Sequence, residues 1–63
     1  IAFHDALEQL AKLNVRFAEI VEFRVLGALT IAEIADVLST DEWVVKRDWQ
    51  TARLWLLKEL RGR

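Results

Sequence analysis

Hydrophobic residues recur every three or four positions in four stretches of the chain, which is the period of an amphipathic α-helix. The stretches cover about residues 2–14, the segment from Asn14 to Gly27, about 31–38 and about 42–60. Their apolar faces are formed, in chain order, by Phe3, Leu7, Leu10 and Leu13; by Phe17, Ile20 and Val21; by Ile31, Ile34, Ala35 and Leu38; and by Val45, Trp49, Ala52, Leu56 and Leu60. No segment alternates as a strand would, so the pattern predicts an all-α fold of four helices.

The helix boundaries are marked by residues that favour caps and turns. Asn14 can cap the second helix, and we expect Gly27 to end it in the left-handed conformation of a C′ residue. Thr30 and Glu33 have the spacing of a capping box at the start of the third helix. Asp41 is predicted to cap the fourth and longest helix.

Residues 39–41 leave room only for a tight turn between the third and fourth helices. A short helix, a tight turn and a longer helix form the helix-turn-helix arrangement, here at about residues 30–60. Sixty-three residues allow one small domain, which spans 1–63. Because the chain begins at Ile1 without a methionine, we expect it to be excised from a longer protein.

Charge is distributed unevenly, although the net charge is only −1. Residues 1–41 carry seven acidic and three basic side chains, whereas residues 42–63 carry three acidic and six basic ones. The basic charge therefore lies on the second helix of the predicted helix-turn-helix, where a polyanion could bind. A solvated helix face with ordinary ion pairs is the alternative interpretation.

Several functional classes are disfavoured by composition. The chain has no cysteine, so it offers neither a disulfide nor a thiolate metal site, and we expect no metal and no cofactor. The single histidine, His4, lies beside Asp5 in a first helical turn without a pocket, so we predict no catalytic residues and no enzyme. Neither a membrane-spanning run nor a signal peptide is visible, and we expect a cytoplasmic protein with no membrane partner.

Two segments carry a resemblance to a known family. The sequences "LTIAEIADVL" (29–38) and "VVKRDWQTARLWLLKELRG" (44–62), with a short turn between them, resemble region 4 of bacterial sigma factors of the extracytoplasmic-function group. The preceding "ALEQLAKLNVRFAEIVEFRVLGALT" (6–30) is similar to the upstream part of that region. The likeness covers nearly the whole chain.

The resemblance implies a four-helix DNA-binding domain that recognises the minus-35 promoter element while bound to the flap of RNA polymerase. By position in the motif, the residues expected to contact bases are Lys46, Arg47, Gln50 and Thr51. Thr30 and Arg24 would contact phosphate. The helical period independently places the four base-contacting residues on the face opposite the apolar stripe. Lysine and arginine can donate to guanine, and glutamine can pair with adenine.

Departures from the family pattern suggest a second hypothesis. Trp43 and Val44 stand where the family usually has a small residue and a threonine, and Ser39 replaces the usual glycine of the turn. With Phe23 and Val25 they could form an apolar surface, produced by divergence or by laboratory redesign. Such a surface would bind an anti-sigma regulator or a second copy of the chain. Alternatively, Trp43 packs back onto the second helix, or the domain is purely structural.

Overall fold

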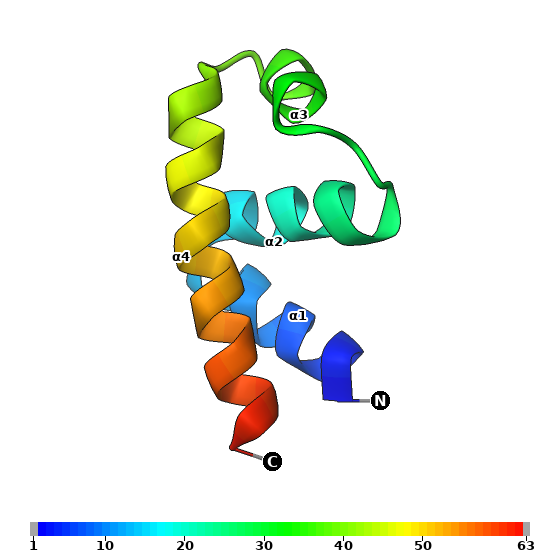
Figure 1. The fold of residues 1–63 in the computed structure, drawn as a ribbon. Coiled ribbons are helices and arrows are strands. Elements are labelled where there is room, and N and C mark those ends of the chain that lie inside the picture. Colours follow the sequence, from blue (N-terminus) through cyan, green and yellow to red (C-terminus); the bar gives the residue numbers. More distant parts are fainter. Residues whose placement is uncertain (1, 63) are drawn as a thin grey trace.

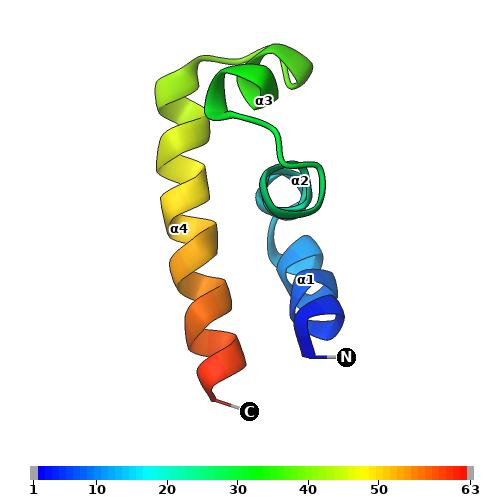
Figure 2. The same cartoon turned by 45° about the vertical axis from the view of Figure 1, so that its right-hand side comes forward.

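The computed structural model describes residues 2–62, and their secondary structure is helical without strands. The elements are α1 (Ala2–Leu13), α2 (Val15–Val21), the π-helix η1 (Glu22–Leu26), α3 (Ile31–Val37) and α4 (Glu42–Arg61). The long helix α4 forms one side of the molecule, and α1, α2 and α3 each pack against it (Figure 1). Seen from a second direction, α3 lies near the start of α4 and α1 near its end, with α2 between them (Figure 2). The predicted all-α fold is confirmed.

Two of the predicted helix caps have the expected side-chain hydrogen bonds. Asn14 Oδ1 accepts from the backbone N–H groups of Arg16 and Phe17, at 3.0 and 3.2 Å. Thr30 Oγ1 accepts from Glu33 N–H at 3.1 Å, and Glu33 Oε1 accepts from Thr30 N–H at 2.8 Å. These bonds satisfy amides that the first turn of a helix would otherwise leave without a partner. They fix where α2 and α3 begin.

The cap of α4 differs from the prediction. Asp41 occupies the N-cap position with an extended backbone, but its side chain makes no capping hydrogen bond. Its backbone carbonyl instead accepts from the N–H groups of Val44 and Val45, at 3.1 and 3.2 Å. In the turn before it, Ser39 has a φ of 55°, the left-handed conformation for which glycine is best suited.

Gly27 ends the helix as predicted, but the predicted left-handed conformation was wrong. Its φ is −86°, and it is Ala28, with a φ of 54°, that adopts the left-handed conformation. The last turn widens into a π-helix, in which Gly27 N–H donates to Glu22 O at 2.9 Å. A Cβ on Gly27 would lie 2.9 Å from both the carbonyl oxygen of Phe23 and a methyl carbon of Leu29. Glycine is therefore required here for space and not for a positive φ.

The core consists of two clusters that lie along α4. The buried members of the first are Ala6, Leu7, Leu10, Ala18, Val21, Ala52 and Leu56. Those of the second are Ile20, Ile34, Ala35 and Val45. Trp49 is half-buried and packs against both clusters. The expectation that Trp49 belongs to the core is confirmed in this form, with part of the side chain left accessible.

We predict that Trp49→Ala removes about a third or more of the free energy of unfolding of the domain. A half-buried tryptophan truncated to alanine should cost about 3 kcal/mol. A chain of this length has a total stability of roughly 3–9 kcal/mol. Urea denaturation followed by far-UV circular dichroism measures the change. Leu54→Ala is the control, because Leu54 is 60% exposed and its truncation should leave the midpoint nearly unchanged. Equal midpoints for the two variants would contradict the bridging role of Trp49.

Candidate nucleic-acid interface

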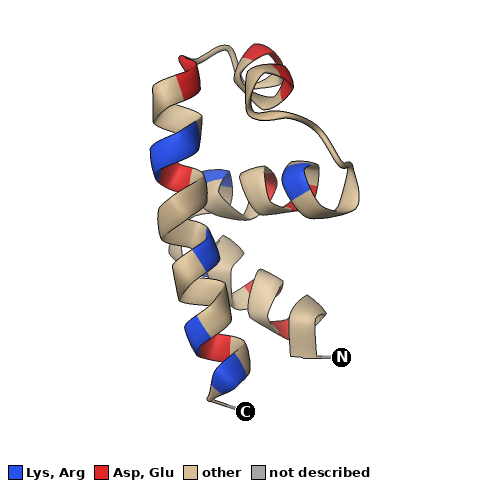
Figure 3. Cartoon of the chain, in the orientation of Figure 1, with Lys and Arg blue, Asp and Glu red and all other residues tan. Residues whose placement is uncertain are grey.

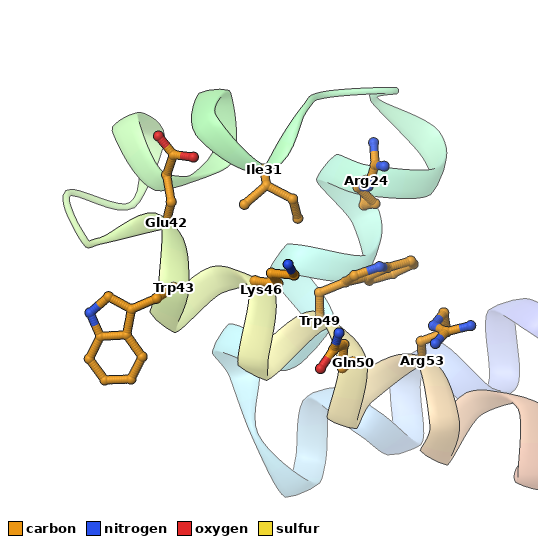
Figure 4. A pocket seen from close by; sticks show the side chains of 8 residues that line it. All are labelled: Arg24, Ile31, Glu42, Trp43, Lys46, Trp49, Gln50 and Arg53. Atoms are coloured by element: carbon orange, nitrogen blue, oxygen red, sulfur yellow. The ribbon is translucent and has the colours of Figure 1, made fainter.

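An open groove of about 700 Å³ lies between η1, the start of α3 and the N-terminal half of α4. Its lining residues are Arg24, Ile31, Glu42, Trp43, Lys46, Trp49, Gln50 and Arg53 (Figure 4). Trp49 extends from α4 toward η1, so this half-buried core residue also lines the groove. The same indole thus stabilises the core and shapes this surface.

The charged side chains that line the groove are mostly basic. Lys46, Gln50 and Arg53 follow one another at helical spacing on α4, and all three are exposed. Lysine and arginine positions recur along the length of this helix (Figure 3). Arg24 faces them from η1, where its Nη1 donates to the backbone carbonyl of Leu29 at 2.9 Å. This bond ties the Arg24 guanidinium to the loop that follows η1. Three cations against the single acidic side chain of Glu42 make the groove attractive to an anion.

The other predicted DNA contacts lie outside the groove lining. Arg47 and Thr51 are exposed on the same helix, but Arg47 turns toward Trp43 and Asp48, and Thr51 Oγ1 donates to Arg47 O at 3.2 Å. Thr30 is exposed, with its hydroxyl and amide engaged by Glu33 in the capping box. Of the six predicted contacts, the structure brings together Arg24, Lys46 and Gln50.

The four residues of the predicted apolar surface differ in exposure. Trp43 is 62% exposed and Val25 49% exposed. Phe23 and Val44 are half-buried, and Phe23 packs against the core cluster around Ile34. The indole of Trp43 extends away from the other residues that line the groove (Figure 4). Trp43 therefore does not pack back onto α2, and only part of the predicted patch is accessible.

Two features of the site were not predicted from the sequence. Arg53 completes the row begun by Lys46 and Gln50, and its spacing from them was a usable signal. The second is Asp48, which is only 4% exposed. Its Oδ2 atom lies 2.9 Å from Nη2 of Arg16 on α2. The contact is an ion pair by distance, although its angle is not that of a hydrogen bond. A charged residue between Val45 and Ala52 on an inward stripe was the available signal.

The comparison with known families decides the identity of the fold. A family model described as ECF sigma factor matches residues 1–62. The chain belongs to the ECF sigma factor family. It therefore has a role in transcription as a sigma factor, and DNA binding through a helix-turn-helix, with promoter DNA and RNA polymerase as partners, follows from the family. No curated protein and no solved structure matches the chain.

The ECF sigma factor family consists of transcription regulators and not of enzymes. Within residues 2–62, no three histidine, cysteine, aspartate or glutamate side chains are grouped so that they could hold a metal ion. In the same part of the chain, none of the helices has the length and apolar character needed to cross a membrane.

We predict that Arg16→Ala destabilises the domain by about 2 kcal/mol, because it leaves the buried Asp48 carboxylate without its closest cation. Arg16→Lys should restore part of the loss. Thermal and urea unfolding provide the measurement, with Arg53→Ala as a matched control on an exposed side chain. If Arg16→Ala and Arg53→Ala unfolded at the same urea concentration, the ion pair would contribute nothing measurable.

Proposed function

We propose that this ECF sigma factor domain recognises the minus-35 promoter element as part of the RNA polymerase holoenzyme, with α4 as the recognition helix. The family supplies the role in transcription, and the chemistry of one surface supports the finer assignment. An α-helix fits the major groove of DNA, and residues on its exposed face then lie against base edges.

The basic groove is the observation that carries the proposal. Lys46, Gln50 and Arg53 lie in a row on α4, and Arg24 faces the same space from η1. A duplex that received α4 in its major groove would bring a phosphate strand toward Arg24. Cations on two separate elements therefore allow one set of side chains to contact bases while another fixes the register on the backbone.

Different chemical roles follow for these side chains. Lys46 can donate to O6 and N7 of guanine, and Gln50 can make a bidentate pair with adenine. Arg24 and Arg53 would contact phosphate oxygens. Thr51, one turn after Arg47, remains a proposed base contact, since its oxygen can still accept a hydrogen bond.

Thr30 is the weakest of the proposed phosphate contacts. Its hydroxyl and amide both bond Glu33, whose carboxylate lies at the start of α3. A negative charge at this position opposes a phosphate there. The proposal therefore depends more on Arg24 than on Thr30 for contact with the DNA backbone.

We predict salt-dependent DNA binding that requires Lys46. Duplexes selected for binding from a randomised pool would be titrated with the domain by fluorescence anisotropy at several salt concentrations. Lys46→Ala should weaken binding roughly tenfold if it contacts a base. If Lys46 contacts phosphate instead, the salt slope should fall by about one. The matched control is Lys58→Ala, which removes the same charge from the far half of α4. Equal losses for both variants would show non-specific attraction and contradict the proposed interface.

An interaction surface centred on Trp43 is the second candidate, favoured by the 62% exposure of its indole. Its partner would be a second copy of the chain or an anti-sigma regulator. Charged side chains of both signs, Glu42 and Lys46 among them, lie beside Trp43, and the cost of removing them from water disfavours self-association. We therefore predict that the 7.3 kDa chain and its Trp43→Ala variant both sediment as monomers at micromolar concentrations. A dimeric parent with a monomeric variant would favour the self-association hypothesis.

A further inference from the structure

Arg47 is held between an aromatic ring and a carboxylate on the outer face of α4. Its guanidinium carbon lies 5.2 Å from the centre of the Trp43 ring, within the range of a cation–π contact. Its Nε donates to Oδ1 of Asp48 at 3.3 Å. The Arg47 side chain is nevertheless 56% exposed, so the guanidinium remains accessible to a ligand.

The carboxylate in this arrangement is itself fixed by the core. The Asp48 side chain is 5% exposed, and its second oxygen forms the 2.9 Å ion pair with Arg16 of α2. Asp48 therefore cannot turn outward to follow a mobile Arg47. The acceptor of the Nε hydrogen bond is anchored to a second helix, although Trp43, Arg47 and Asp48 all belong to α4.

Two restraints of different kind act on one planar group. The ring of Trp43, one helical turn before Arg47, favours a particular orientation of the guanidinium plane. The bond from Nε to Asp48 restricts rotation of the group within that orientation. The two Nη atoms are the donors that make bidentate contacts with guanine O6 and N7. A guanidinium restrained in the free protein loses less conformational freedom on binding than a mobile one.

We propose that Trp43 is a positioning residue that, with Asp48, holds Arg47 for a bidentate contact with guanine at one position of the promoter element. This inference rests on the proposed function. It gives the exposed indole a partner within its own helix. It also explains how a large aromatic residue at the start of the recognition helix is compatible with DNA binding.

The test is a double-mutant cycle of Trp43→Ala and Arg47→Ala, measured on the selected duplex and on duplexes substituted one base at a time. We expect Arg47→Ala to weaken binding roughly tenfold and to abolish the preference for guanine at one position. Trp43→Ala should weaken binding about threefold and reduce the preference at the same position. The double variant should match Arg47→Ala alone, because Trp43 acts only through Arg47.

Two further measurements separate positioning from a general structural effect. Replacing the guanine by 7-deazaguanine removes the N7 acceptor, so the parent should lose affinity while Arg47→Ala should not. Trp43→Phe should restore most of the guanine preference, since phenylalanine also offers a ring face. In the free protein, the Nε–H resonance of Arg47 in nitrogen–proton NMR spectra should be protected from exchange in the parent and lose protection in Trp43→Ala.

Contrary outcomes distinguish this inference from the proposed function. If Trp43→Ala weakened binding equally in the presence and absence of the Arg47 side chain, Trp43 would act by itself and the inference would fail. The proposed function would still hold if Lys46→Ala weakened binding more than Lys58→Ala. Tighter binding by Trp43→Ala would show that the ring withholds Arg47 from DNA, which also overturns the inference. If the parent bound no duplex from the pool, both would fail together.

Discussion

The packing of Trp49 against both core clusters is the contact on which the rest of the structure depends. A domain of this size buries too little surface for two independent cores, so both clusters pack against the same helix. That helix is α4, which contacts α1, α2 and α3. Because Trp49 lies where the two clusters meet, it fixes the side of α4 that faces inward and therefore the side that faces solvent.

The candidate DNA interface follows from this orientation of α4. Once Val45 and Ala52 are buried, Lys46, Gln50 and Arg53 must lie on exposed faces of the same helix. The ion pair between Arg16 and Asp48 adds a polar contact between α2 and α4. It also places a carboxylate beside Arg47, so an interaction that joins two helices bears on a side chain at the proposed DNA surface.

The groove and the restrained arginine are complementary parts of one surface. Arg24 comes from a π-helical turn whose geometry depends on the absence of a Cβ at Gly27. Arg47 lies beside the groove and is held by neighbours within its own helix. The position of Arg24 depends on the correct folding of the loop after η1. The position of Arg47 depends only on α4 being helical and on Asp48 being buried. A tryptophan that departs from the family pattern is thereby consistent with the function of the family.

The sequence by itself determined the helices, the caps at Asn14 and Thr30, and the family, because periodicity and capping depend on residues close together in the chain. It also placed Lys46, Arg47, Gln50 and Thr51 on one helix face, where they remain predicted contacts. Only the tertiary structure decided that Asp48 pairs with Arg16 and that Arg24 faces Lys46, since these contacts join segments distant in sequence. The role of Gly27 also needed the structure, although its neighbours Phe23 and Leu29 are close in sequence, because it depends on how closely their atoms approach in the π-helical turn. Local patterns specify which elements form, but the steric and electrostatic fit between elements decides which side chains meet.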